Sequence, residues 1–555
     1  MEIVVESDAN RKERVNLACI QCRARHVKCD ASRPICNRCE RDGKECTYKK
    51  SRRGGLDKAA LARRKLRLQE EAERAQKEQD GDLAFHVDSN RLLELYFENF
   101  WPSLPIILPL HHLQWRQSRD GHGMETLLVV LQYIGAIYAP WQHPGLYRKT
   151  VMQALDSPFL AHTPFNVQAL LLFAVAEYHS DCKSEGRILL NVAVKIALEL
   201  HMNDQAFAQA HGEGSPVLEE SWRRTYYFLV IADQNFAVFS NTPIYTSANV
   251  SNTVDLPCDD EYFNSGLIPP VMSLQDYENR ELAELEIVFS STVYLYDLQL
   301  IVKSMMDMFV ETGNFGDTMI EVHDAKLAIW TSLLPACKKD PSQRDGTIDE
   351  VMFAAHMAAT IALNGLHRSF SSLGMCDEEI TTKSFLPSVL FVTPPQQGRA
   401  AHTARVLKAS EMHTRLLAIP CTMERHNVFT MYMVARLATT QISACRYLLE
   451  DRALAIARDR IRLSIGFLRS MGSVWPLGKM MAKEVSHIAR INLLKSQSTV
   501  AEVQDLTLEM DMPRDDLIFP VDPSAQIDIF SGLMLPIDWE TTSCSYAPVA
   551  PFDLP

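Results

Sequence analysis

Six of the chain's 13 cysteines lie within 28 residues, and the other seven are scattered singly along the 555 residues. Gaps of two, six, six, two and six residues separate the clustered ones, which are Cys19, Cys22, Cys29, Cys36, Cys39 and Cys46. A dense group beside isolated cysteines indicates a metal site and not a disulfide framework.

The spacing divides this cysteine cluster into two similar halves. Each half opens with a Cys-x-x-Cys pair, which we expect at the start of a short helix, where one turn brings both thiolates onto one ion and the helix amino terminus favours their charge. The third cysteine follows six residues later. Six thiolates cannot fill two separate tetrahedra, so two zinc ions would have to share two bridging sulfurs. By the quasi-symmetry these are Cys19 and Cys36.

The stretch from Ala18 to Asp30, ACIQCRARHVKCD, followed by RPICNRC from Arg33 to Cys39, resembles the fungal binuclear zinc cluster family of transcription factors. All six cysteine positions match, and Pro34 matches the proline of the family's central loop. The resemblance implies two Zn²⁺ ions that share six thiolates, one held by Cys19, Cys22, Cys29 and Cys36, and the other by Cys19, Cys36, Cys39 and Cys46. The alternative is a zinc knot with no role in DNA binding.

Energetics and charge fit this interpretation. A module of about 35 residues has almost no core, whereas structural zinc supplies on the order of 10 kcal/mol of folding free energy per site. Residues 16–50 contain nine Lys/Arg and four Asp/Glu. Because two Zn²⁺ and six thiolates sum to only −2, the module remains cationic, which suits contact with phosphates.

Four basic residues lie between Cys22 and Cys29, and we expect them on the first helix: Arg23, Arg25, His26 and Lys28. In the family, the carboxyl end of this helix reaches base edges in the major groove, commonly at a CGG triplet. The resemblance assigns base contact to Arg25 and to His26, which stands where lysine is usual, and Arg25 is the better candidate for a bidentate guanine contact. Arg23 and Lys28 are expected on phosphates. The alternative for each is a solvated surface charge.

The formal net charge of −13 would by itself argue against a DNA partner. The charge is polarised, however: residues 1–68 carry 19 Lys/Arg and 9 Asp/Glu, whereas residues 69–555 carry 37 and 60. The cationic head is therefore compatible with double-stranded DNA as a partner.

Several classes of protein are disfavoured. The amino terminus lacks the basic and apolar runs of a secretory signal, and no apolar stretch reaches the 18 residues of a membrane span. We find no zinc-protease, nucleophile-elbow, phosphate-loop or dinucleotide motif, so the sequence predicts no enzyme. An enzyme pocket in the large helical region described next is the remaining alternative of that class.

The linker after the cluster is basic and contains a short helical pattern. Lys49 to Arg53 and Arg63 to Lys65 are basic runs that could serve nuclear import. Leu61, Leu68 and Ala75 are seven residues apart within 57–79. This pattern allows a short coiled coil and hence a homodimer, or a solvated single helix.

From about residue 86 apolar residues recur at helical spacing, which predicts an all-α body. The clearest runs are 167–178, 189–200, 281–310, 351–366, 400–418, 428–449 and 453–471, with Pro164 and Gly186 as punctuation. The body also resembles the family's middle homology region at 166–202 and 222–257, with departures at Gln234 and at Asn241 to Pro243. Asp233 is expected to be half-buried, as a ligand or switch group or as a satisfied structural group.

The acidic tail, residues 496–555, contains eleven Asp/Glu, one Arg and seven prolines, with bulky apolar residues among the acids. This composition is typical of an activation segment that orders on binding the transcription machinery. The alternative is that residues 527–539 pack onto the body.

Together these features predict a small zinc-cluster domain, with two short helices around two zinc ions, followed by a large all-α domain. The predicted segments are a flexible amino terminus (1–15), the cluster (16–50), the linker (51–85), the regulatory body (86–495) and the acidic tail (496–555). The predicted function is a nuclear, sequence-specific transcription factor for RNA polymerase II genes, more specifically an activator of a metabolic or secondary-metabolite gene set. The alternative is a zinc-dependent nuclear co-regulator without base-specific contacts.

Overall fold

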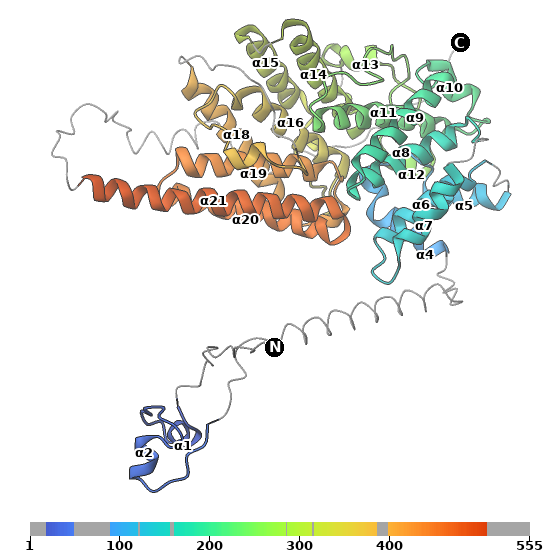
Figure 1. Cartoon of the computed structure of the whole chain (residues 1–555). Coiled ribbons are helices and arrows are strands. Elements are labelled where there is room, and N and C mark those ends of the chain that lie inside the picture. The colour runs from blue at the N-terminus through green and yellow to red at the C-terminus, as the bar shows by residue number, and fades with distance from the viewer. Residues whose placement is uncertain are drawn as a thin grey trace, which may run out of the picture. The chain divides into compact units, whose positions relative to one another are not determined.

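The computed structural model describes residues 18–48, 89–119, 123–155, 160–284, 286–313, 316–385 and 398–507, with side chains to residue 493. The chain divides into two compact units, residues 1–86 and 87–555 (Figure 1). The predicted linker helix at 57–79 and the acidic tail beyond Thr507 lie outside the described residues.

The amino-terminal unit consists of two short helices in a repeated design. Helix α1 spans Ile20–Ala24 and α2 spans Asn37–Arg41. Each begins after a cysteine N-cap, Cys19 or Cys36, whose sulfur accepts a hydrogen bond from the backbone N–H three residues on. Equivalent residues of the two halves are 17 positions apart, as the near-repeat of the cysteine spacing indicates.

The second unit, the helical body, is built of helices joined by loops. Its first part contains α4 (Ser89–Asn99), η1 (Trp101–Ser103), α5 (Leu110–Arg119), α6 (Glu125–Ile137), α7 (Pro144–Leu155), α8 (Pro164–His179), α9 (Lys183–Glu199), α10 (Gln205–Ala210), α11 (Pro216–Phe239), α12 (Asp260–Ser265), α13 (Leu274–Glu278) and η2 (Arg280–Leu282). Its second part contains α14 (Ser291–Thr312), α15 (Asp317–Leu333), η3 (Ala336–Lys338), α16 (Glu350–Arg368), α17 (Asp377–Ile380), α18 (Arg399–Leu417), η4 (Met423–Arg425), α19 (Thr430–Tyr447), α20 (Asp451–Val474) and α21 (Pro476–Thr507).

The predicted all-α class is confirmed. Within the described ranges, the only β-type pairings are two isolated bridges, Leu256 with Met272 and Ser342 with Ile348. Within the same residues, no helix has the length and apolar character that a membrane span requires.

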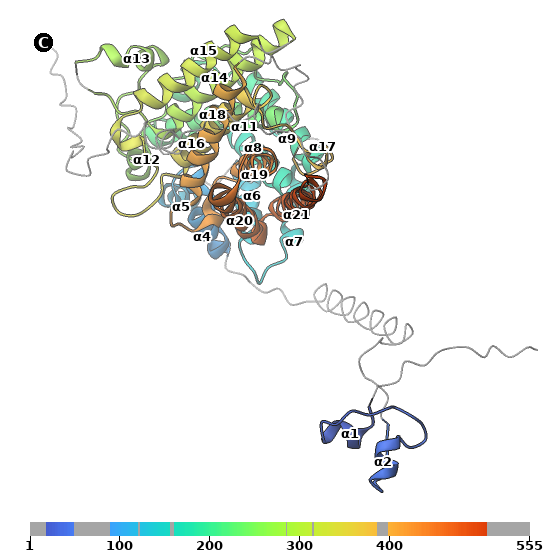
Figure 2. The ribbon, with the colours of Figure 1, turned by 90° about the vertical axis from the view of Figure 1, so that its left-hand side faces the viewer.

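Helices α8, α11, α16 and α19 form the core of the body. Figure 2 shows α8 and α19 surrounded by other helices, and α9, α18, α20 and α21 pack against these core helices from outside. Every residue of α8 from Phe165 to His179 is buried, so this helix is enclosed on all sides and not amphipathic as its sequence predicted. Its polar side chains are satisfied internally: Gln168 donates to the hydroxyls of Ser221 and Thr225.

Two predicted details of the body are wrong. The predicted run at 281–310 becomes an α-helix only at Ser291. Residues 281 and 282 belong to η2, and Ser290 is extended and donates a hydrogen bond to the Pro257 carbonyl. Gly186 does not interrupt a helix but lies inside α9. A Cβ there would come within 2.8 Å of the Ala174 carbonyl oxygen of α8, so glycine permits the close approach of the two helices.

Asp233 is fully buried instead of half-buried, and all its contacts are internal. Its carboxylate accepts hydrogen bonds from Arg187 at 2.7 Å and from both the backbone N–H and the hydroxyl of Ser247 at 2.9 Å. These contacts make Asp233 a structural group that ties α9 and the loop after α11 together.

Candidate metal centre and nucleic-acid interface

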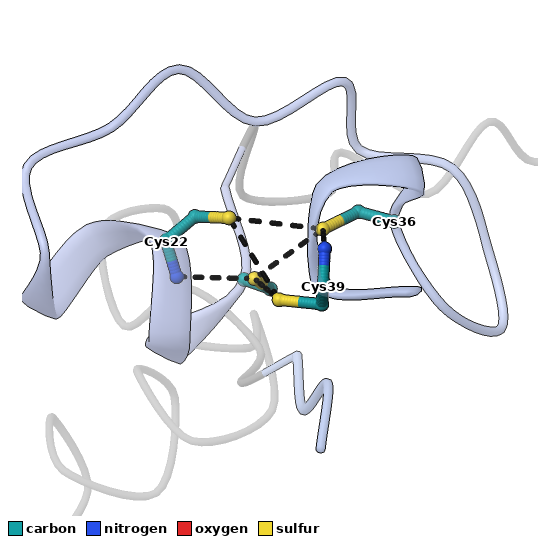
Figure 3. A group of neighbouring side chains, drawn as sticks. Cys22, Cys36 and Cys39 are labelled. Atoms are coloured by element: carbon teal, nitrogen blue, oxygen red, sulfur yellow. Dashed lines mark hydrogen bonds between the residues drawn. The ribbon is translucent and has the colours of Figure 1, made fainter. Parts of the chain in front are cut away.

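The sulfurs of four cysteines converge between the two short helices of the amino-terminal unit. Figure 3 shows the side chains of Cys22, Cys36 and Cys39 pointing toward one another. The Sγ atoms of Cys19 and Cys36 are 3.8 Å apart, and those of Cys19 and Cys39 are 3.6 Å apart. The Sγ atom of Cys22 lies 3.7 Å from that of Cys36 and 3.8 Å from that of Cys39. All four cysteines are completely buried.

These spacings fit tetrahedral zinc. A Zn–S distance of 2.3 Å places two sulfurs of one tetrahedron about 3.8 Å apart. The Cys19–Cys36 distance is of this size, and so is the distance between Cys22 and Cys39. The sulfurs of Cys19 and Cys36 also each lie at such a distance from a second sulfur of the opposite half, Cys39 or Cys22 respectively.

The remaining two cysteines lie at the rim, in equivalent places. The Cys29 sulfur accepts a hydrogen bond from the Cys19 N–H at 3.5 Å, and the Cys46 sulfur accepts one from the Cys36 N–H at 3.4 Å. Both side chains are half-buried, and the Cys29 sulfur is within 4.8 Å of that of Cys36. Each rim sulfur thus adjoins one of the predicted bridging cysteines, and the six thiolates together form a binuclear zinc site.

Acid–base properties of the thiols show why the site needs cations. Burial, together with hydrogen bonds to Cys19 and Cys36, raises the pKa of Cys22 to about 12. At the start of α2 the Cys39 N–H instead lowers the pKa of Cys36. The Cys36 thiol is thus predisposed to ionise, whereas the Cys22 thiol becomes a thiolate only beside a positive charge, which Zn²⁺ supplies.

The four basic residues of the predicted DNA-binding segment are all exposed, but only Arg23 lies on the helix. Helix α1 ends at Ala24, Arg25 is its C-cap, and His26 and Lys28 follow in the loop. The prediction that all four are helical is wrong because His26 adopts a left-handed conformation, with φ +52°, which stops the helix. The N–H of Val27 then donates to the Cys22 carbonyl at 3.0 Å and closes the turn.

Arg25 is held by three contacts on the surface of the cluster. Its Nη1 donates to Asp42 Oδ2 at 2.9 Å, its Nε to the Gln21 carbonyl at 3.3 Å, and its Nη2 to the Cys39 sulfur at 3.9 Å. Its side chain is one-third exposed. No sequence motif marks Asp42 as this partner, although the 17-residue offset between the halves pairs it with Arg25.

A second missed contact closes the module. The Gln21 side chain donates to the Thr47 hydroxyl at 2.8 Å and accepts from the Thr47 N–H at 3.0 Å. The Ile20 N–H donates to the Thr47 carbonyl at 2.9 Å. The end of the module is thereby fastened beside the start of α1, and no pattern in the sequence indicates this pairing.

The sequence model of the fungal Zn(2)-Cys(6) binuclear cluster domain matches residues 17–55. Residues 17–55 therefore form a domain of this family. The chain thus combines a binuclear zinc cluster with a large helical body.

The chain is 26% identical over 412 residues to the C6 finger domain transcription factor iacK of Pestalotiopsis fici, a match that covers 72% of this chain and 59% of that protein. It is 55% identical over 40 residues to the Zn(2)-C6 fungal-type transcription factor afumD of Aspergillus fumigatus, which is 7% of this chain and 10% of that protein. It is 43% identical over 49 residues to transcription factor qa-1f of Neurospora crassa, which is 9% and 6% respectively. No solved structure matches the chain significantly. The chain thus spans about three-fifths of the length of iacK and resembles it well beyond the cluster.

Proposed function

We propose that this chain is a zinc-dependent, sequence-specific DNA-binding transcription factor that acts in the nucleus. The observation that carries the proposal is the arrangement of the cluster. Buried thiolates fix its interior, while Arg23, Arg25, His26 and Lys28 are exposed around the end of one helix. Similarity to a C6 finger transcription factor over 72% of the chain supports the same function.

Arg25 is the proposed base-contacting residue. A guanidinium has five N–H donors, and the three contacts within the protein use one donor on each nitrogen. One donor therefore remains on Nη1 and one on Nη2, which is the pair that a bidentate contact to guanine O6 and N7 requires. A CGG-type half-site is the expected target. Arg23 and Lys28 supply phosphate contacts, which set position and affinity but not sequence preference.

The remaining parts of the proposal concern the whole protein. The acidic tail would recruit the transcription machinery, and the target genes would belong to a metabolic or secondary-metabolite set transcribed by RNA polymerase II. The residues at 57–79 would allow a homodimer on paired half-sites.

A second candidate function, a nuclear co-regulator without base-specific contacts, is favoured by two observations. Arg25 is already paired with Asp42, and histidine stands beside it at position 26 where the family usually has lysine. In this alternative the cluster would bind DNA through phosphates alone or would bind another protein.

Titration of the zinc-loaded full chain against two labelled duplexes distinguishes the candidates. One duplex contains CGG half-sites, and the other has the same composition in scrambled order. We expect at least tenfold tighter binding to the CGG duplex, the discrimination that one bidentate contact provides. Equal affinities at every salt concentration would support the co-regulator instead.

A further inference from the structure

A cysteine, a histidine and a glutamate lie in line inside the helical body, far along the chain from the zinc cluster. The Sγ atom of Cys421 is 3.0 Å from Nε2 of His426, and Nδ1 of His426 is 2.6 Å from Oε2 of Glu350. Cys421 lies in the loop between α18 and η4, His426 caps η4, and Glu350 is the first residue of α16. The proposed DNA-binding function does not use these three side chains.

Neighbouring side chains hold the imidazole of His426 in place between Cys421 and Glu350. His426 is 2% exposed, and its ring stacks on Phe353 with centroids 3.9 Å apart and planes 5° apart. The Phe467 ring stacks on it too, at 5.7 Å. Glu350 is 7% exposed and therefore keeps its carboxylate beside the ring instead of turning to solvent. Both ring nitrogens thus have one fixed neighbour each.

This geometry allows a proton to move from sulfur to nitrogen. The thiol proton can pass to Nε2 over 3.0 Å, and the resulting imidazolium donates through Nδ1 to the Glu350 carboxylate. Burial opposes the charged ring, but the hydrogen bonds to Cys421 and Glu350 prevail and raise the pKa of His426 to about 9. Such a transfer would leave a thiolate paired with an imidazolium, which is the nucleophilic form of cysteine.

Cys421 is partly exposed, whereas its base is enclosed. Cys421 is half-buried, and its neighbours Pro420 and Thr422 are exposed. A small reagent can therefore reach the sulfur from solvent while the imidazole remains enclosed between aromatic rings. Such a site differs from a structural cysteine, which is buried without a base and is inert.

We propose that Cys421 is a covalent modification site for soft electrophiles of the α,β-unsaturated carbonyl class. The thiolate sulfur forms a bond to the β-carbon, and the π electrons of the C=C bond shift onto the α-carbon. The imidazolium of His426 returns the proton to that carbon, so the thiol adds across the double bond with no oxidant or reductant. His426 and Glu350 act as positioning residues for this step.

We expect an adduct in this loop to alter the loop's contacts with the rest of the body. Asn427, next to His426, donates to the Ser103 carbonyl at 2.9 Å, and Ser470 of α20 donates to Glu424 at 2.5 Å. An adduct on Cys421 therefore adds bulk to a loop that joins the start of the body, α16 and α20. This would give the regulatory body a chemical input that is independent of DNA binding.

The test uses the zinc-loaded full chain and N-ethylmaleimide as the probe, added below stoichiometry at pH 7 and followed by peptide mass mapping. Cys182 and Cys258, which are also half-buried, are the internal reference, because burial raises the pKa of both thiols. An ordinary thiol is a few per cent ionised at pH 7, so ionisation can raise the rate by a factor of tens. We expect Cys421 to react at least tenfold faster than either reference, and any smaller ratio would overturn the proposal.

Two variants separate the role of the imidazole from simple exposure. His426→Gln should slow labelling of Cys421 at least tenfold and leave Cys182 and Cys258 unchanged. His413→Gln is the matched control, since His413 is also fully buried but lies on α18, and it should leave the Cys421 rate unchanged. A smaller effect of His426→Gln in a folded protein would overturn the proposal; if that variant does not fold, the ratio measured in the wild-type chain decides.

Discussion

Arg25 and Asp42 occupy equivalent positions in the two halves of the zinc cluster, each as the C-cap of its helix, and their side chains form an ion pair of 2.9 Å. The repeat that places the cysteines therefore also places an acid against the residue proposed to contact bases. Because each side chain is only about one-third exposed, the pair restricts Arg25 to a subset of its rotamers. If Arg25 makes the proposed base contact, we expect Asp42 to position it.

Replacing the acid tests this role. Asp42→Asn should raise the affinity for every duplex, because a negative charge near the phosphates is removed. It should also lower the preference for the CGG duplex, by up to about fivefold, since an exposed ion pair contributes ~0.2–1 kcal/mol. Paired titrations at one salt concentration measure both quantities. An unchanged preference would show that Asp42 does not orient Arg25.

The two kinds of DNA contact respond differently to truncation. Arg25→Ala should lower discrimination between the CGG and scrambled duplexes by ~1–3 kcal/mol. Lys28→Ala should weaken binding to both duplexes alike and flatten the dependence of affinity on salt. Arg41→Ala, which removes an exposed cation from α2, is the matched control and should leave discrimination intact. The opposite pattern would reverse the assigned roles.

In the turns that follow α1 and α2, introducing a glycine and removing one should have opposite effects on zinc retention. His26 and Gly43 are equivalent residues, with φ of +52° and +60°, and only glycine adopts this conformation without cost. His26→Gly should strengthen zinc retention and Gly43→Ala should weaken it, each by about 1 kcal/mol. A Cβ on Gly43 meets no atom within 4 Å, so any effect there is conformational and not a clash. Competition with a chelator measures both, and equal retention would exclude strain at His26.

Removal of zinc should unfold the amino-terminal unit and leave the helical body folded. The native chain should contain two zinc ions, and a chelator should unfold residues 18–48, because the buried core of this stretch consists of cysteines, with Val27 and Tyr48 only partly buried against them. The body has its own large apolar core and should keep its helices. Metal analysis with far-UV circular dichroism measures both effects. A stoichiometry of one zinc, or loss of most helical signal, would contradict this account.

Stability of the body should depend on pH through His426. Its folded pKa of about 9 exceeds the usual 6.5, so its stabilisation is complete below pH 6.5 and is lost as pH rises through 9. The full effect is about 3 kcal/mol. Glu350 and Cys421 are the titratable groups in contact with the ring, and Phe353 and Phe467 cover its faces.

Thermal unfolding between pH 6 and 10 tests this dependence. Glu350→Gln removes the main charge partner and should flatten the profile, whereas Glu411→Gln, which removes an exposed ion pair on α18, should not. An identical profile for both variants would contradict the assignment to His426.

The sequence predicted best the features whose geometry follows directly from the spacing of residues along the chain. Six cysteines in two equivalent groups define the metal site, since thiolates at one helical turn must converge. The helical periods at 400–418 and 453–471 correspond to α18 and α20, because amphipathic helices on a core repeat their apolar residues regularly. Those at 351–366 and 428–449 correspond to α16 and α19, which are buried along almost their whole length.

The remaining features depend on contacts between distant residues. The pairing of Arg25 with Asp42 and of Gln21 with Thr47 arises only after the cluster closes. The turn at His26 contains no glycine that would mark the end of the helix, so the sequence predicted a longer helix. The line of Cys421, His426 and Glu350 joins residues up to 76 positions apart, and no local motif marks it.

The most direct test of the central claim, sequence-specific binding by the zinc cluster, is selection from a random duplex library. The zinc-loaded full chain and its Arg25→Ala variant would be carried through the same rounds, and the enriched sequences compared. We expect CGG triplets to be enriched by the native chain and to be lost or degenerate with the variant. Recovery of no motif by the native chain, with retention of duplexes that depends only on salt, would contradict the claim.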